Sequence, residues 1–299
     1  MRQLRENLDD GNVLIWMDFA ENFSCTSVDE VQSAYWNNAM VTLHTQVIYF
    51  PKSFGQSHQS MVGISESLSH NASSVYAMQK KLFPMIKQMY PDLKVIHYLT
   101  DSPTSQYRNK AMFYLISHYP EIFHVRATWD FLEAGHGKGP CDGLGASVKR
   151  SADMNIKQGK CVIQTAEDFF AWTESITSSS VKYFYVLNED VENCSQYIQS
   201  VSSQLLSVPG TIKVHAASPV CSEFIMIRNM SCYCQGCNNN LSDRACDGWS
   251  KCRISKQSTE LEINKNGRDN QLEPQVHAEI ENQGNENDSS NAENRFANG

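Results

Sequence analysis

The residues Val13-Leu-Ile-Trp-Met-Asp18 form a short apolar run that ends in an acid, and Leu93-Lys-Val-Ile-His-Tyr-Leu-Thr-Asp101 repeats this pattern. Short apolar runs of this kind are typical of strands that are covered on both faces of a sheet. Open α/β sheets place their functional groups at the carboxyl ends of such strands. We therefore predict two buried strands whose terminal acids lie at the same edge of one sheet.

The segments around these runs predict an α/β fold, with a mixed sheet flanked by helices. Residues 74–89 carry apolar side chains at helical spacing, and residues 41–50 are rich in β-branched and aromatic residues, which favours a strand. Residues 51–60 are polar and are expected to form a connection. Further strands are predicted at 65–71 (or an irregular approach to a helix), 125–132, 181–187 and 224–227, and helices at 29–36, 109–118, 144–156, 165–172 and 195–206.

Composition divides the chain into a folded part and a polar tail. Residues 255–299 contain 9 acids, 4 bases and a single aromatic residue, Phe296, so they bury too little apolar surface to fold. Without this tail the chain carries 21 bases and 24 acids, which argues mildly against tight DNA binding by this chain alone. We expect an N-terminal extension (1–11), a catalytic-type domain (12–180), an α/β extension with a Cys-rich segment (181–254) and a disordered tail (255–299).

The sequence lacks features of a membrane or secreted protein. It has no run of about 18 apolar residues, and its first residues lack the apolar core of a signal peptide. Its ten cysteines are therefore expected to be reduced or to bind metal. A buried strand is expected as early as Val13, so we expect the chain to be a fragment of a longer intracellular protein.

Three acids, Asp18, Asp101 and Asp142, are candidates for one site. Two strand-end carboxylates and a third from a following helix can hold Mg²⁺, which prefers oxygen ligands and stabilises the transition state of phosphoryl transfer. Each acid also has a structural explanation: an Asp at a strand end often caps a turn, and Asp142 can cap the helix that we predict from Leu144. Spacing alone leaves both explanations open.

Four blocks of the sequence are long and specific. They are Asp18-Phe-Ala-Glu-Asn22, Asp29-Glu-Val-Gln-Ser33, Thr100-Asp-Ser-Pro-Thr-Ser-Gln-Tyr-Arg-Asn109 and His136-Gly-Lys-Gly-Pro-Cys-Asp-Gly-Leu-Gly145. These blocks resemble a dispersed family of transposon-derived animal genome proteins, which is similar to RNase H-like DDE/DDD transposases. The resemblance covers residues 12 to about 175, with a weaker match to Trp249.

The resemblance implies an RNase H-like fold and a nuclease or transposase that uses Mg²⁺ or Mn²⁺. Such enzymes carry one acid on the first strand, one after the fourth and one on a later helix. Asp18 and Asp101 match the first two positions, and Asp142 is our choice for the third. Glu133 is its rival because Asp142 lies in a glycine-rich turn. The implied reaction hydrolyses a DNA phosphodiester, and the freed hydroxyl then attacks a phosphodiester of another strand.

The implied partner is DNA, recognised with the help of a missing N-terminal part, and the implied compartment is the nucleus. A homo-oligomer is compatible with this interpretation. Gln106, Arg108, His136 and Lys138 are candidate contacts to the nucleic acid, since Arg and Lys are common phosphate ligands. Surface solvation, or packing of the turn for His136, is the structural alternative.

The densest cysteine cluster predicts a structural Zn²⁺ site. Four thiolates satisfy the tetrahedral preference of Zn²⁺, and the spacing C-x-C-x2-C-x8-C is compact. The ligands that we expect are Cys232, Cys234, Cys237 and Cys246, with Cys252 or His215 as substitutes. Disulfides are disfavoured because the sequence carries no secretory signal.

Three functional hypotheses follow from the sequence. The first is a transposon-derived, Mg²⁺-dependent DNA nuclease or transposase domain. The second is a domesticated relative that keeps the fold as a DNA- or protein-binding module without catalysis. The third, a purely structural zinc-stabilised interaction domain, requires the three acids to lie apart in space.

Overall fold

The first predicted strand, β1 (Asn12–Phe19), lies inside a ten-stranded mixed sheet. The computed structural model describes residues 2–25, 39–133, 139–176, 180–232 and 248–256, all within one unit, Met1–Gln257. β1 pairs antiparallel with β3 (Met40–Tyr49) on one side and parallel with β5 (Val95–Thr100) on the other. The apolar run of β1 is therefore continuous because neighbouring strands and helices bury it on all sides.

The strand order is β10-β9-β8-β6-β5-β1-β3-β4-β7, and the two-residue β2 (Phe23–Ser24) pairs with β3. β4 is antiparallel to β3, β6 is parallel to β5, and β7 is parallel to β4. β8, β9 and β10 extend the sheet as antiparallel strands. The bounds of these strands are β4 His58–Ser65, β6 Arg126–Phe131, β7 Val181–Val186, β8 Ala216–Cys221, β9 Phe224–Arg228 and β10 Ser250–Arg253.

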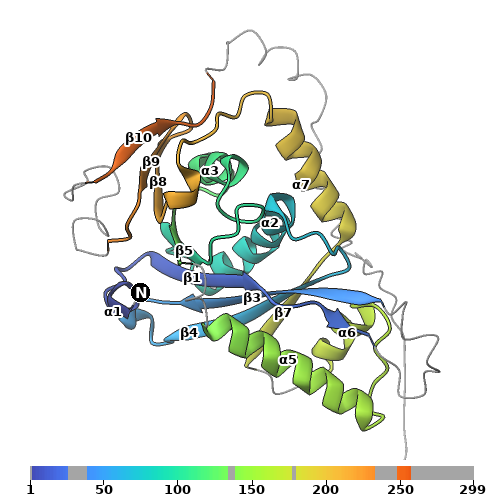
Figure 1. Ribbon diagram of the computed structural model, residues 1–299. Helices are drawn as coiled ribbons and strands as arrows, with labels where there is room; N and C mark the ends of the chain where they lie inside the picture. Colours follow the sequence, from blue (N-terminus) through green and yellow to red (C-terminus); the bar gives the residue numbers. More distant parts are fainter. Residues whose placement is uncertain (1, 26–38, 134–138, 177–179, 233–247, 257–299) are drawn as a thin grey trace, which may run out of the picture. The chain divides into compact units, whose positions relative to one another are not determined.

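Helices cover both faces of the sheet (Figure 1). One face carries α2 (Ala72–Met89), α3 (Lys110–Ser117), α4 (Tyr119–Ile122) and α7 (Asn188–Val201), and the other carries α5 (Pro140–Lys157) and α6 (Ala166–Glu174). The short elements are α1 (Arg2–Glu6), η2 (Lys52–Phe54) and η3 (Thr211–Lys213). Of the helices in the described parts of the chain, none combines the length and apolar character needed to cross a bilayer.

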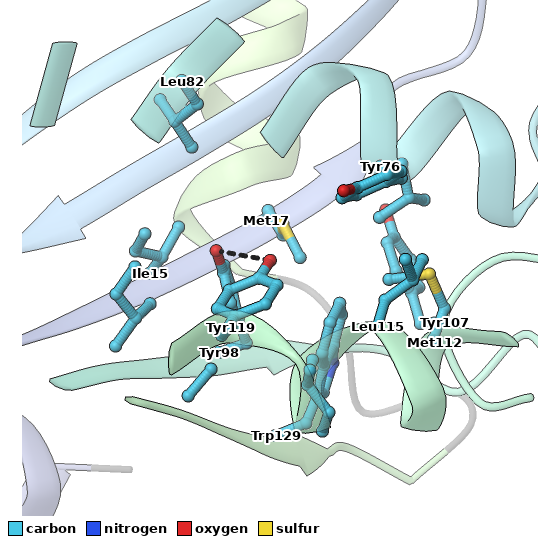
Figure 2. Packing of buried hydrophobic residues seen from close by; sticks show 14 of the residues in the cluster. Ile15, Met17, Tyr76, Leu82, Tyr98, Tyr107, Met112, Leu115, Tyr119 and Trp129 are labelled. Carbon is cyan, nitrogen blue, oxygen red and sulfur yellow. Dashed lines mark hydrogen bonds between the residues drawn. The ribbon is translucent and has the colours of Figure 1, made fainter. Parts of the chain in front are cut away.

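Alternate residues of the central strands supply two separate cores. Ile15 and Met17 of β1 pack with Tyr98 and Trp129 under α2 and α3 (Figure 2), whereas Leu14 faces α1 and the start of α5. The Tyr98 and Tyr119 hydroxyls lie 3.2 Å apart, so these two buried phenols satisfy each other within an apolar layer. The central strands are therefore fixed in register, since a slip by one residue would exchange the two faces.

The predicted mixed α/β sheet with flanking helices is confirmed, and several boundaries need correction. The polar segment 51–60 is only partly a connection, because β4 already begins at His58. The predicted helix from Leu144 begins four residues earlier, at Pro140, where proline needs no hydrogen-bond partner for its nitrogen. β8 and β10 were not predicted. The helix predicted at 165–172 is confirmed as α6, and a capping box of Thr165 and Asp168 opens it.

Three predicted segments lie wholly or largely outside the described residues. They are the helix at 29–36, the Cys-rich segment around Cys234 to Cys246, and the tail from 257 onward. The strands β7 to β10, from the segment 181–254, belong to the same sheet as the strands before residue 180.

Close packing at Gly63 gives a stability prediction. A Cβ atom on Gly63 of β4 would lie 2.6 Å from Met78 Sδ and 2.8 Å from the Phe184 ring. We expect Gly63→Ala to lower the free energy of unfolding by about 1–3 kcal/mol, because these side chains must shift in a filled core. Urea unfolding followed by circular dichroism measures the change.

The matched control is Gly143→Ala in α5, where nothing lies within 4 Å of the added methyl group. This variant should be stabilised by about 0.5–1 kcal/mol, because alanine is favoured over glycine inside a helix. Equal effects of the two substitutions would contradict the packing described at Gly63.

Candidate active site

Asp18 and Asp101 occupy matching positions on neighbouring parallel strands. In the pairing of β1 with β5, Trp16 lies opposite Leu99. The same register carried two residues further places Asp18, near the end of β1, opposite Asp101, which directly follows β5. Paired residues on parallel strands point to the same face of a sheet. The two carboxylates therefore share one face at one edge, as the sequence predicted.

The first turn of α5 is held against the same face. A Cβ atom on Gly139 would lie 2.3 Å from Cζ2 of Trp16, so only glycine allows the helix to start this close to β1. The buried Cys141 thiol donates to the Trp16 carbonyl at 3.2 Å. These contacts position Asp142, the next residue, beside the two strand acids.

The electrostatics of the site show that the three acids lie near one another. Burial raises the pKa of Asp18 to about 7, and the charges of Asp101 and Asp142 contribute to this rise. Burial also raises the pKa of Asp101, with a further contribution from Asp142. Like charges close together disfavour ionisation, so this site favours either protons or a cation.

Asp142 has a second role at the start of its helix. Its Oδ2 accepts a hydrogen bond from the Gly139 backbone N–H at 2.9 Å, which caps α5. The structural explanation considered for Asp142 is therefore partly correct, although Asp142 is the third residue of the helix and not its N-cap. The side chain is exposed, so its charge reaches the site from the solvent side.

The strand acids fit a hard divalent cation. Asp101 Oδ1 is buried and has no hydrogen-bond partner, so a carboxylate oxygen is available to a ligand. Within the described residues, no group of three or more His, Cys, Asp or Glu side chains is arranged to hold a metal ion. Mg²⁺ is commonly held by one or two carboxylates, with water and substrate phosphates completing its shell, and Asp18 and Asp101 can supply that pair.

A buried polar group behind the end of β1 was not predicted. The Tyr107 hydroxyl lies 3.1 Å from His44 Nε2, and His44 Nδ1 lies 2.5 Å from Gln46 Nε2. Burial, and next the neighbouring His70, lowers the pKa of His44 to about 3, so its imidazole is neutral. Burial also raises the pKa of Tyr107 well above its usual value, with contributions from Asp18 and Asp101. The signal in the sequence was the alternation of polar residues His44 and Gln46 within an apolar strand.

The four predicted nucleic-acid contacts, Gln106, Arg108, His136 and Lys138, differ in whether the structure describes them and in how far they are buried. Gln106 is half-buried in the turn after β5. Arg108 is buried, donates to the Val214 carbonyl at 3.2 Å and lies 6.0 Å from the centre of the Phe131 ring. Its guanidinium is therefore engaged inside the fold, which disfavours a role in contacting phosphate. His136 and Lys138 lie outside the described residues.

The rival third acid, Glu133, is exposed in the segment after β6. Its charge is not among the causes that raise the pKa of Asp18 or Asp101, whereas that of Asp142 is. The choice of Asp142 over Glu133 as the third acid stays a prediction.

The predicted zinc site is only partly covered by the described residues. Cys234, Cys237 and Cys246 lie outside them, Cys232 is half-buried after β9, and Cys252 is half-buried in β10. The substitute ligand His215 already contacts the Phe131 carbonyl through Nδ1 at 2.9 Å. The zinc site stays a prediction.

Comparison with solved structures finds the human cytomegalovirus terminase nuclease domain. One structure of that domain has a TM-score of 0.25 and 10% identity, and the match covers 67% of this chain and 76% of that one. A second, soaked with Mn and bound to an inhibitor, has a TM-score of 0.24 and 11% identity, with coverage of 64% and 75%. TM-scores this low carry no argument about fold or activity. No curated protein matches the chain.

A family model described as "Domain of unknown function (DUF8701)" matches residues 1–231. The matched segment includes the central strands, α5 and all three candidate acids, as well as the sequence blocks that carry the resemblance to transposon-derived proteins. The model covers more than half of the chain. The protein therefore belongs to the family described as Domain of unknown function (DUF8701).

Proposed function

We propose that this domain is a transposon-derived, Mg²⁺- or Mn²⁺-dependent DNA nuclease or transposase with an RNase H-like core. The observation that carries the proposal is the placement of Asp18 and Asp101 on one face at one edge of the sheet, where the charge of Asp142 also raises the pKa of both. Carboxylates crowded into a half-buried site are costly for folding, and such groups are concentrated at functional sites.

The sheet topology supports the proposal. The strands β1, β3 and β4 form an antiparallel series, and β5 and β6 follow in parallel on the other side of β1. The resulting order, β4-β3-β1-β5-β6, is the arrangement expected of an RNase H-like core. Asp18 lies on its first strand, Asp101 follows the fourth, and Asp142 lies on the next helix of this face, which are the positions that the resemblance implies.

The residues divide the chemistry between them. Asp18 and Asp101 would hold the cation, and Asp142 would act from the first turn of α5. When bound, the divalent cation would polarise the phosphodiester and promote deprotonation of the attacking water. Attack at phosphorus breaks the P–O bond to the leaving strand, which departs with a free hydroxyl. In strand transfer, that hydroxyl would be the next nucleophile.

A domesticated module without catalysis is the second candidate. Two observations favour it: Asp142 is already engaged in capping its helix, and the chain carries a net charge of −8. The third hypothesis, a purely structural domain, required the acids to lie apart, and their mutual electrostatic effects oppose it.

Metal-dependent nicking of supercoiled plasmid tests the proposal. We expect Asp18→Asn and Asp101→Asn each to reduce nicking in Mg²⁺ or Mn²⁺ by more than ~100-fold, because each removes a negative ligand from the cation. Asp142→Asn should also reduce nicking, and Asn still offers an oxygen to the Gly139 N–H, so the helix cap is retained. Gel densitometry against time gives the rates.

The matched control is Glu133→Gln, which removes the same charge from the rival acid. It should leave nicking unchanged, and circular dichroism should show that all four variants are folded. Retained nicking in Asp18→Asn and Asp101→Asn would refute this site. If the native protein is folded but inert with both metals, the binding-module function replaces the proposed one.

The raised pKa of Asp18 predicts a pH dependence of stability. Folded Asp18 keeps its proton up to about pH 7, whereas the unfolded chain releases it near 3.8. The folded state therefore binds more protons between these values, and its stability falls as pH rises from about 4 to about 7. Asp18→Asn removes this loss, so its Tm should exceed that of the native protein by several degrees at pH 8 and by little at pH 4.

Millimolar Mg²⁺ should raise the Tm of the native protein at pH 8, because the cation binds the ionised acids of the folded state. It should not raise the Tm of Asp18→Asn. Differential scanning fluorimetry at both pH values, with and without Mg²⁺, measures these shifts. Parallel pH profiles for the two proteins would contradict the assigned burial of Asp18.

A further inference from the structure

A cavity of about 460 Å³ lies between α1 and the connection from β3 to β4. Arg5 and Glu6 line it from α1, Tyr49 from the end of β3, Lys52 from η2, and His58 from the start of β4. The candidate acids are not among its lining residues, so this is a second site. A cavity of this volume accommodates a small ligand.

The chemistry of the lining suits a planar anionic ligand. The Arg5 guanidinium carbon lies 5.4 Å from the centre of the Tyr49 ring, and the His58 ring lies 6.1 Å from the same ring. Lys52 adds a second permanent cation, and Glu6 is the single acid of the lining. Residues 1–254 carry 21 bases and 24 acids, so a lining with two permanent cations and one acid has the opposite sign of charge from the folded part as a whole.

The walls of the cavity are fixed by buried contacts. Leu4 of α1 is 2% exposed and packs with Leu14 and Tyr49, which anchors the helix that carries Arg5. In the β3–β4 connection, the ring centres of Phe50 and Phe54 lie 4.7 Å apart. The Phe50 backbone N–H donates a hydrogen bond to the Ser57 carbonyl at 3.2 Å. Packing therefore fixes the two backbone segments that carry Arg5 and Lys52, while the two side chains are exposed.

The cavity lies on the acid-bearing face of the sheet, at a distance that suits a nucleic-acid strand. Tyr49 pairs with Leu14, and Thr45 pairs with Asp18, so four residues of β3 separate the two sites. At about 3.3 Å per residue this is about 13 Å. A stacked strand rises about 3.4 Å per nucleotide, so about four nucleotides span that distance. The buried side chains of Leu14, Tyr49 and Cys141, which belong to one apolar cluster, lie between the two sites.

We propose that this cavity is a subsite for a nucleotide of the substrate strand, with Arg5 and Lys52 binding its phosphate and the exposed His58 ring contacting its base. This inference rests on the proposed nuclease function and adds a place at which the chain binds its DNA substrate. The subsite compensates for the low overall charge of the chain, because it gathers two cations where the strand would pass. A free mononucleotide also carries a phosphate that Arg5 and Lys52 could bind. The experiment therefore distinguishes a DNA strand from a free mononucleotide as the ligand.

The test is equilibrium binding of a fluorescein-labelled 12-nucleotide oligothymidylate to the full chain in EDTA, followed by anisotropy. EDTA prevents metal-dependent cleavage, so the result is independent of nicking. Arg5→Gln and Lys52→Ala should each weaken binding about ten-fold, the usual loss for a charged hydrogen bond. Each should also lower the slope of log affinity against log salt by about 0.7, the value for one phosphate contact to a single strand.

Lys160→Ala is the matched control. Lys160 is exposed just after α5, whose 18 residues place it about 27 Å from the end near the acids. It removes one positive charge but should leave both affinity and slope unchanged. Lys52 is exposed, so its replacement should not unfold the protein, and unchanged circular dichroism verifies this.

Thymidine 5′-monophosphate and thymidine, as unlabelled competitors, separate the sources of phosphate. Competition by the monophosphate but not by thymidine supports phosphate recognition in the cavity. The proposal is overturned if both variants keep the native oligonucleotide affinity and the native slope of log affinity against log salt. Loss of monophosphate binding in these variants would then show that the cavity binds a free nucleotide instead. Absence of oligonucleotide binding by the native protein also overturns it, whereas failure of the nuclease function shows separately as absence of nicking.

Discussion

The parallel pairing of β1 with β5 is the constraint on which the rest of the site depends. Its register joins residues that are 83 positions apart, and the same offset separates Asp18 from Asp101. A shift of this pairing by one residue would send one acid into the apolar core beneath α2. The cores on the two faces oppose such a shift, because each is filled by alternate side chains of the same strands. Packing far from the acids thus sets the distance between them.

The same arrangement creates unfavourable repulsion between carboxylates at the site. The fold brings carboxylates together where water is partly excluded, and among the described residues no basic side chain shifts the pKa of Asp18 or Asp101. A hydrogen bond to the Phe19 backbone lowers the pKa of Asp18, and the partial positive charge at the start of α5 is already used by Asp142. A site with this imbalance is stabilised by whatever supplies positive charge, which explains why it suits a divalent cation.

Much of the central fold was predictable because it follows from local periodicity. β1, β5 and α2 were placed within about two residues, and the acids were placed at the correct strand ends.

The predicted start of α5 was wrong because glycine and proline usually interrupt helices. Here Pro140 occupies the first turn, and Gly145 allows an approach in which a Cβ would lie 2.9 Å from the Ala20 methyl group. β8 was missed because Pro219 and polar neighbours hide a short strand. The pairing of Tyr107 with His44 depends on contacts 63 residues apart, which periodicity does not report.

The cap on α5 has a consequence for how a nuclease of the proposed kind would lose its activity over evolutionary time. Asp142 serves its helix as well as the site, so selection for a stable fold alone would preserve it in a lineage that had stopped cutting DNA. Asp101 has no second, structural role of this kind, because its buried Oδ1 makes no hydrogen bond and its charge is unfavourable in the folded state. Drift should therefore erase Asp101 early once catalysis is no longer selected. Among relatives, an acid at this position is the better molecular marker of a lineage still under selection for chemistry.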